Sequence, residues 1–450
     1  MSKSYSVKKG LDIRLKGAAE LKAEKAPIAE EYALVPDDFH GVVPKLLVKE
    51  GDSVKVGTAV FYDKSDERVR FASPVSGKIA EIVRGEKRKI LHIRIQPDRM
   101  QQFEDRGLVN AVDPKSLITS LCEAGAWPLF RQRPFDVIPN PDSQPKAIVV
   151  TGFDSAPLAP NADFALSGRE SDLETGLKAL VVLANGKPVY FNKKSGSQVD
   201  TKVQGVTVNS FSGQHPAGNV GVQIAAISPM NKGEVVWTLD AQTVAILGRF
   251  ISTGHLDLTR RVALTGSEVA NPTYWDMLPG AKLSSVTGGN ITSDHYRTIS
   301  GNVLTGHGHG KDGYLGFYDH QITVVPEGDE PKFLLTTGWL GAGLDKFSAS
   351  RAFPTWLMPK SKTWKLDTNT NGEERAFVVT GQYEGVFPFD IYPVQLLKAA
   401  ITNDLEALEN LGIYEVAPED FALCEYVCTS KINSQSIIRE ALDEVRRECV

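Results

Sequence analysis

The sequence predicts a multidomain protein that combines α/β and α+β architecture. Three observations lead to this fold class. The chain has 450 residues, which is more than one ordinary hydrophobic core organises, so two to four domains are expected. Within residues 211–265 a strand is followed by a helix and a second strand, which is the order found in α/β sheets. Residues 393–445 carry apolar side chains at helical spacing, which predicts a helical end to the chain.

Residues 1–100 are expected to form a β domain. A tight turn is predicted at Lys49 to Asp52, and strands are predicted at Ala59 to Tyr62 and at Lys78 to Ile82, where apolar and polar residues alternate. The paired motifs VKEGD and SPVSG resemble the flattened barrel-sandwich of biotinyl and lipoyl carrier domains. Carriers of this kind need a Met-Lys pair at a hairpin tip. The tip here, Tyr62 to Asp66, has no methionine, so Lys64 is predicted to be an ordinary solvated residue.

Residues 101–256 are expected to form a Rossmann-like αβ domain. Asp113 followed by Pro114 predicts the start of a helix that Gly125 can end. A strand is predicted at Lys146 to Thr151, and Ser171 to Glu174 has the pattern of a capping box that opens a second helix. Another strand is predicted at Pro188 to Phe191.

The centre of the αβ domain is the most regular stretch of the chain. Residues Glu234 to Leu239 are short and β-rich, as in a buried strand. Asp240 can cap a helix that ends at Gly254, and Arg261 to Thr265 begins the next strand. This order is typical of α/β sheets of the kind that bind nucleotides.

The last two predicted segments differ in character. Residues 303–375 are expected to be a β-rich segment interrupted by glycines, and residues 376–450 a small C-terminal helical bundle whose first helix begins at Pro393.

Composition excludes several classes of protein. The net charge is -5 and 42% of the residues are hydrophobic, which argues against a general nucleic-acid binder. No uncharged apolar run reaches the roughly 18 residues that a membrane span needs. The first residues lack the apolar centre of a secretory signal, and four cysteines do not make a disulfide scaffold. These observations predict a cytoplasmic protein.

Longer motifs connect the chain to a known family. They are SPVSG, RPFD, FSGQHPAGN, VVWTLDAQTVAILGRFISTG, GWLGAGLDKFS, GQYEGVFPFDI and PEDFALCEYVC. In this order, and from Val7 to Val450, they resemble the A subunits of the bacterial sodium-translocating NADH:quinone oxidoreductase. More distantly the chain is similar to the flavin-bearing subunit of respiratory complex I and to the C subunits of the Rnf complex.

The resemblance implies a peripheral subunit on the cytoplasmic face of the inner membrane, in a six-subunit complex that passes electrons from NADH to ubiquinone and exports sodium. Flavins and iron–sulfur clusters are then expected in partner subunits, and residues 257–302 are expected to form a β-grasp module of the soluble-ligand-binding (SLBB) type. The alternative is a flavin-binding NADH dehydrogenase subunit of complex I or Rnf type. A biotinyl or lipoyl carrier modified at Lys64 is a third alternative.

The loop Gly125 to Pro134 bears on the flavin alternative. In the distant relatives a glycine-rich loop at this place lets the backbone approach the flavin phosphate. Here Pro128 and Pro134 lack an N–H, and Trp127 and Phe130 fill space that a phosphate needs. We therefore expect no flavin or NADH site, and no cofactor, in this chain.

One short glycine motif, Gly308 to Gly313, matches G-x-G-x-x-G. A dinucleotide site needs a strand before this motif and a helix after it, but an aromatic and β-branched run follows, Tyr314 to Val325. The motif is therefore predicted to be a loop between strands.

Candidate metal ligands are few. His307, His309 and His320 cluster in sequence, with Asp312 and Asp319 as the nearest carboxylates, but the spacing matches no zinc site. No metal site is predicted.

Two cysteines lie four residues apart near the C-terminal end. Cys424 and Cys428 could share one face of a helix, and only Cys449 follows them, whereas an iron–sulfur cluster needs four thiolates. We expect core cysteines.

A quinone is the one small molecule that the family implies for this chain. Quinone sites need an apolar cleft and a few donors. The candidate is the loop with Phe130, Arg131, Arg133, Phe135 and Asp136, where the arginines could donate to a quinone carbonyl and the aromatic rings could stack on it. The alternative is that this loop only caps the αβ sheet or contacts a partner subunit. No catalytic residue is predicted.

Overall fold

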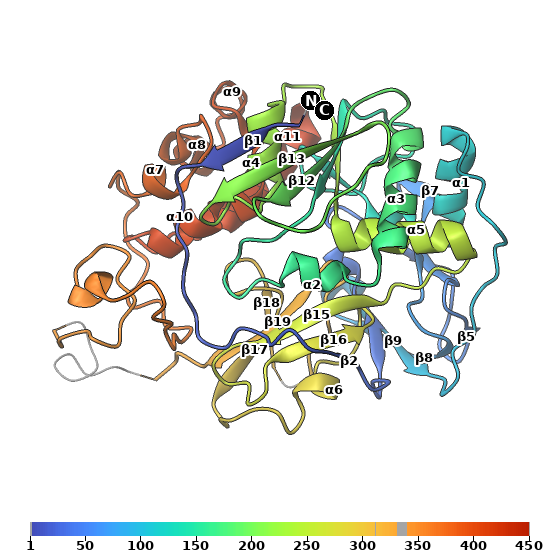
Figure 1. Ribbon diagram of the computed structural model, residues 1–450, viewed down its shortest axis with the longest axis horizontal. Helices are drawn as coiled ribbons and strands as arrows, with labels where there is room; N and C mark the ends of the chain where they lie inside the picture. The colour runs from blue at the N-terminus through green and yellow to red at the C-terminus, as the bar shows by residue number, and fades with distance from the viewer. Residues whose placement is uncertain (1, 311, 331–339, 450) are drawn as a thin grey trace.

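The computed structural model describes residues 2–310, 312–330 and 340–449. Its parts are a barrel-sandwich, an αβ domain, a second mixed sheet and a set of C-terminal helices, which confirms the predicted fold class. Figure 1 shows the C-terminal helices, in red, beside the αβ sheet, and the second sheet below that domain.

The barrel-sandwich consists of two small antiparallel sheets. One sheet has the order β3 (Tyr32–Leu34), β9 (Ile90–Pro97), β8 (Gly77–Arg84) and β5 (Ser53–Val54), and the other has β4 (Pro44–Leu46), β6 (Ala59–Asp63) and β7 (Asp66–Ala72). The rings of Phe61 and Phe71 stack between them with centroids 4.3 Å apart. Lys64 lies in the turn between β6 and β7 and is exposed, as predicted.

The αβ domain is built on a six-stranded sheet. Its order is β1 (Ser4–Val7), β13 (Val206–Gly213), β12 (Val189–Lys194), β11 (Ala147–Thr151), β14 (Val236–Asp240) and β10 (Arg131–Arg133). All neighbours are parallel except β10, which pairs antiparallel with β14. The chain passes from β11 to β12 on one side and returns to β14 on the other. The strand order therefore reverses between β11 and β14.

Helices cover both faces of this sheet. On one face, α1 (Pro114–Ala124), α3 (Glu170–Leu183) and α5 (Ala241–Thr253) share a core with Ile148 and Val150. Val149, which points to the opposite face, packs with Ile224 of α4 (Val220–Ile227). The short α2 (Ala162–Leu166) lies between the domain and the second sheet.

The ends of α1 and α5 confirm the predicted caps. Asp113 accepts the Ser116 N–H at 2.9 Å, and Asp240 accepts the Thr243 N–H at 3.0 Å. Gly125 and Gly254 end these helices with a φ of 73° each, a conformation that glycine adopts without strain.

The predicted capping box at Ser171 to Glu174 is wrong. Helix α3 begins at Glu170, and its N-cap is Arg169, whose side chain makes no capping hydrogen bond. The pattern failed because Leu173 and Leu177 are anchored in the core, and tertiary packing sets the start of the helix.

The second sheet holds the β-grasp module and extends past it. Its order is β18 (His307–His309), β17 (Tyr296–Ser300), β19 (Gln321–Pro326), β15 (Arg260–Thr265), β16 (Thr273–Met277) and β2 (Ala23–Lys25), with α6 (Ser284–Thr287) beside it. Thus β18 and β19, expected in a separate β-rich segment at 303–375, complete this sheet instead.

The rest of the segment 303–375 also differs from the prediction. Over residues 327–330 and 340–375 the structure has no strand, only a single bridge residue at Trp364 and the 3-10 turn Pro354–Leu357. Strand β19, which precedes these residues, has Ile322 and Val324 inside the core. The start of the motif GWLGAGLDKFS, Gly338 and Trp339, lies outside the described residues.

The C-terminal helices form a second hydrophobic core. They are α7 (Tyr383–Val386), α8 (Pro393–Ile401), α9 (Leu405–Asn410), the 3-10 turn η6 (Pro418–Phe421), α10 (Ala422–Val427) and α11 (Ser434–Cys449). Phe387, Leu397 and Leu442 are 0–1% exposed in it. Ile13 and Leu15 belong to the same core, so the N-terminal segment is part of the C-terminal packing. In Figure 1 this segment, in blue, runs from β1 to β2 and so joins the two six-stranded sheets.

Asp38 joins the barrel-sandwich to the second sheet. Its carboxylate accepts the N–H of Phe317 at 2.8 Å, and burial, with Asp319 and Asp37 nearby, raises its pKa to about 7. Between pH 4 and 7 the folded chain keeps a proton that the unfolded chain has released, so stability falls as the pH rises through this range.

We therefore expect Asp38→Asn to be more stable than the wild type by roughly 2 kcal/mol at pH 8 and nearly equal to it near pH 4. Urea denaturation across this range measures the difference. Asp294→Asn, at an exposed aspartate away from Asp38, is the control and should keep the wild-type pH dependence. A constant offset between Asp38→Asn and wild type at every pH would refute the assignment.

Candidate functional site

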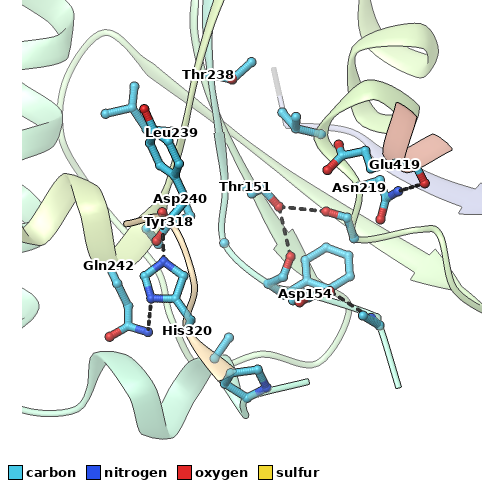
Figure 2. Close-up of a pocket in the computed structure, with 18 of the residues that line it drawn as sticks. Thr151, Asp154, Asn219, Thr238, Leu239, Asp240, Gln242, Tyr318, His320 and Glu419 are labelled. Atoms are coloured by element: carbon cyan, nitrogen blue, oxygen red, sulfur yellow. Dashed lines mark hydrogen bonds and ion pairs between the residues drawn. The ribbon is translucent and has the colours of Figure 1, made fainter. Parts of the chain in front are cut away.

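A cavity of about 250 Å³ lies at the carboxyl ends of β11 and β14. This is the point where the strand order reverses, and in open α/β sheets ligands bind at that point. Residues from several parts of the chain line it, among them Leu129, Arg131, Arg133, Asp136, Thr151, Phe153, Asp154, His215, Asn219, Leu239, Asp240, Gln242, Tyr318, His320 and Glu419. In Figure 2 Tyr318, Asp240 and His320 lie on one side and Thr151, Asp154 and Asn219 on the other.

Arg131 and Tyr318 form an aromatic and cationic part of the wall. The Arg131 guanidinium carbon is 4.9 Å from the centroid of the Tyr318 ring, and Asp136 makes an ion pair with the same guanidinium. The Tyr318 hydroxyl donates to the carbonyl of Pro128 at 2.7 Å. Burial raises the pKa of Tyr318 well above its usual value, so the phenol is neutral. The side chain of Arg131 is 35% exposed and has donors left for a ligand.

Arg133 connects this wall to the C-terminal helices. Its side chain is 3% exposed, and its Nη2 lies 2.6 Å from Glu419 Oε1. Its Nη1 is 3.8 Å from Asp420 Oδ2 and its Nε is 3.6 Å from Asp136 Oδ1. Burial alone would lower the pKa of Arg133, but the three carboxylates raise it well above its usual value. The guanidinium stays charged and holds the αβ domain and the C-terminal helices together.

His320 lies on the cavity wall in a fixed orientation. The Gln242 Oε1 accepts the Arg261 N–H at 2.9 Å and its Nε2 donates to the Arg261 carbonyl at 3.0 Å, which settles the direction of the amide. The Gln242 Nε2 then faces His320 Nδ1 at 3.3 Å, so Nδ1 is the acceptor. His320 Nε2 lies 3.1 Å from Asp240 Oδ2.

Asp240 is held as a carboxylate. Burial would raise its pKa, but His320 and the hydrogen bonds from Thr243 outweigh burial and hold the pKa far below its usual range. The residue therefore serves both as the cap of α5 and as the partner of His320.

The predicted quinone candidates separate into two groups. Arg131, Arg133 and Asp136 line the cavity. Phe130 and Phe135 do not: Phe130 is 0% exposed, with its ring 5.0 Å from that of Trp127, and Phe135 is 3% exposed.

Backbone geometry explains this division, which corrects the expected stacking by the two phenylalanines. Strand β10 alternates its faces, so the residue before Arg131 points away from the cavity. Phe135 has a φ of 74°, in a turn that directs its ring toward Tyr414 of the C-terminal core, 6.0 Å away. Tyr318 takes the aromatic position on the cavity wall instead.

The loop Gly125 to Pro134 is packed into the interior. Trp127 to Leu129 form a 3-10 turn, and the indole N–H of Trp127 donates to the carbonyl of Pro139 at 2.8 Å. The ring of Trp127 meets that of Trp237 edge to face at 5.3 Å. Both side chains are 0–1% exposed, so the loop contributes rings to the core.

The remaining predicted sites lie elsewhere. Cys424 and Cys428 are buried and unpaired in the C-terminal core, as expected, and burial raises the pKa of the Cys424 thiol well above its usual value. In residues 2–310, 312–330 and 340–449 no group of three or more His, Cys, Asp or Glu side chains could hold a metal ion.

The glycine motif begins in β18, its Lys311 lies outside the described residues, and β19 is the next element described after it. Among the helices described, none is long and apolar enough to cross a membrane.

Three family models match the chain in order. Residues 5–98 match the NqrA N-terminal barrel-sandwich hybrid domain, residues 112–256 the NqrA second alpha/beta domain, and residues 261–309 the NQRA C-terminal domain.

Curated relatives match nearly the whole chain. The A subunit of the Na(+)-translocating NADH-quinone reductase of Rhodopirellula baltica is 38% identical, over 98% of this chain and 98% of the relative. The protein of the same name from Marinomonas sp. is 36% identical over 99% of this chain and 100% of the relative. The one from Pseudomonas aeruginosa is 36% identical over 98% and 99%.

Among solved structures, an NAD+-reducing [NiFe]-hydrogenase in the H2-reduced state aligns with a TM-score of 0.37 and 10% identity, over 75% of this chain and 61% of that one. This likeness is too low to bear on function. The relatives and family models do not support the complex I or Rnf alternative. The chain belongs to the family of Na(+)-translocating NADH-quinone reductase A subunits.

Proposed function

We propose that this chain is the peripheral A subunit, on the cytoplasmic face of the inner membrane, of a six-subunit reductase that passes electrons from NADH to ubiquinone and exports sodium. Within it, the chain binds the ring of a quinone in the cavity at the carboxyl ends of β11 and β14. The observation that carries the quinone proposal is the wall on which the Arg131 guanidinium lies against the Tyr318 ring at the point where strand order reverses.

The chemistry of the wall suits a quinone. A quinone is a flat, neutral ring with carbonyl oxygens at opposite ends, so it needs apolar surface and a small number of donors. Leu129, Phe153 and Leu239 supply apolar surface around the cavity. The guanidinium of Arg131 can donate to a carbonyl while Asp136 holds it in position.

The chain itself is proposed to carry no flavin and no NADH, and to be inactive when isolated. The packing of Trp127 and Phe130 supports this, because their rings fill the place of a phosphate cradle. The flavins and iron–sulfur clusters then belong to partner subunits. Absorbance of the purified chain tests this part: a flavin spectrum in the lone polypeptide would contradict it.

Arg131→Ala tests the quinone proposal. We expect the affinity of the full-length chain for ubiquinone-1 to fall about tenfold, because one charged hydrogen bond to a carbonyl is lost. Isothermal titration calorimetry measures the affinity. Arg88→Ala, at an exposed arginine of the barrel-sandwich, is the matched control and should bind as the wild type does. Equal affinity of Arg131→Ala and the control would exclude this wall as the quinone site.

A further inference from the structure

His215 is a buried cavity residue whose function is not explained by the αβ fold. It lies in the motif FSGQHPAGN, after β13, and is 3% exposed. Its backbone N–H donates to Asp12 Oδ1 at 2.9 Å, and its ring Nδ1 lies 3.0 Å from the hydroxyl oxygen of Ser155. The other ring nitrogen, Nε2, is buried and has no hydrogen-bond partner among the described residues, although the residue lines the cavity.

The contacts of Ser155 fix the tautomer of His215. The N–H of Gly218 donates to the Ser155 hydroxyl oxygen at 2.8 Å, so this oxygen already acts as an acceptor. Among the described residues, His215 Nδ1 is the only other hydrogen-bond partner of the Ser155 hydroxyl, so the hydroxyl proton is donated to Nδ1. A ring nitrogen that accepts carries no proton, so the proton of the neutral ring is on Nε2.

The ring is also kept neutral. Burial lowers the pKa of His215, and Asp154 and Asp12 oppose this only in part. Nε2 is therefore a buried N–H donor on the wall of a cavity, and no described residue accepts from it. Buried donors in folded proteins nearly always pair with a protein group, an ordered water or a ligand, so the Nε2–H of His215 is a donor that a ligand in this cavity can use.

The charges of the cavity decide the class of acceptor. Four carboxylates line it, those of Asp136, Asp154, Asp240 and Glu419, together with two arginines, Arg131 and Arg133. An anion such as a phosphate would meet more negative than positive side chains, whereas a neutral carbonyl oxygen would not be repelled.

We propose that His215 Nε2 donates a hydrogen bond to a carbonyl oxygen of the bound molecule, and that it is the second polar anchor of the quinone ring. This assignment rests on the proposed quinone site. His215 and Arg131 come from different parts of the cavity wall, the connection from β13 to α4 and strand β10. A ring with two opposite carbonyls can be held by one donor at each end, which would fix its orientation for electron transfer.

The variants His215→Leu and His215→Gln test the donor. Gln can place an amide N–H near the position of Nε2, whereas Leu cannot donate. For the full-length chain and ubiquinone-1, we expect His215→Leu to bind about tenfold more weakly and His215→Gln to stay close to the wild type. Weak binding by Leu with retention by Gln supports the proposal. Wild-type affinity in His215→Leu overturns it.

A second measurement needs no substitution. In the wild-type chain with 15N-labelled histidine, the His215 Nε2 resonance should be that of a protonated nitrogen and should shift when ubiquinone-1 is added. Ser155→Ala should change the tautomer signal without removing the donor side chain. A resonance that does not respond to ubiquinone-1, or that responds to inorganic phosphate instead, overturns the assignment.

The outcomes also separate this inference from the proposed function. Loss of affinity in Arg131→Ala with full affinity in His215→Leu would overturn the second anchor and leave the quinone site standing. Full affinity in both variants would overturn both. Melting curves identify a variant that is misfolded, and in that case the resonance of the wild-type chain decides.

Discussion

Arg133→Met is expected to destabilise the folded chain by about 3–5 kcal/mol, because it leaves buried carboxylates without their counter-charge. The side chain of Asp420 is 0% exposed and that of Asp136 is 12% exposed, and both face the Arg133 guanidinium. Burial raises the pKa of Asp420 to about 7, against the pull of Arg133, so loss of the arginine removes what favours its charged form. Urea denaturation at pH 8, where the carboxylates of the wild-type chain are ionised, measures the effect.

Two comparisons make the Arg133 result interpretable. Arg88→Met, at an exposed arginine of the barrel-sandwich, should cost no more than about 1 kcal/mol. Adding Asp420→Asn to Arg133→Met should recover part of the loss, because the two residues are coupled. If Arg133→Met and Arg88→Met unfold at the same urea concentration, Arg133 does not hold the domains together.

Gly248→Ala is expected to cost about 3 kcal/mol or more, because α3 and α5 touch through their backbones. A Cβ at Gly248 would lie 1.8 Å from the carbonyl oxygen of Asp172 and 2.6 Å from the backbone nitrogen of Gly176. A Cβ at Gly176 would in turn lie 2.1 Å from the carbonyl oxygen of Val244. The two helices would have to move apart, and this would disturb the apolar side chains that they pack over β11 and β14.

The control for this prediction is Gly385→Ala in α7. That glycine is also helical, and a Cβ added there meets nothing within 4 Å. Alanine favours helix over glycine by up to about 1 kcal/mol, so this variant should be as stable as the wild type or more so. Thermal unfolding of both variants compares them, and a melting temperature of Gly248→Ala at the wild-type value would contradict the close crossing.

Local signals were sufficient for the parts of the fold that depend on neighbouring residues. Asp113, Asp240, Gly125 and Gly254 act on backbone groups a few residues away, so their roles could be predicted from the sequence. The alternation of β10 could also have shown that Phe130 and Arg131 point to opposite sides, had the short strand been recognised.

The site as a whole could not be predicted, because its members meet only through tertiary structure. Tyr318 reaches Arg131 from the turn before β19, and Glu419 reaches Arg133 from the C-terminal helices, 286 residues away. His215 carries no local pattern that would mark it as a donor without a partner. The domain boundaries at residues 100, 256, 302 and 375 stay predictions, although β18 and β19 show that one sheet crosses residue 302.

The pairing of the N-terminal strands has a consequence for synthesis on the ribosome. Ser4 of β1 pairs with Ser210, 206 residues later, and at about 5–20 residues per second the partner emerges roughly 10–40 s after the first strand. β2 pairs with β16, which emerges later still. During this interval the nascent polypeptide carries two strands without their partners. A tag fused before Ser4 would therefore precede a strand that cannot pair until β13 has been synthesised.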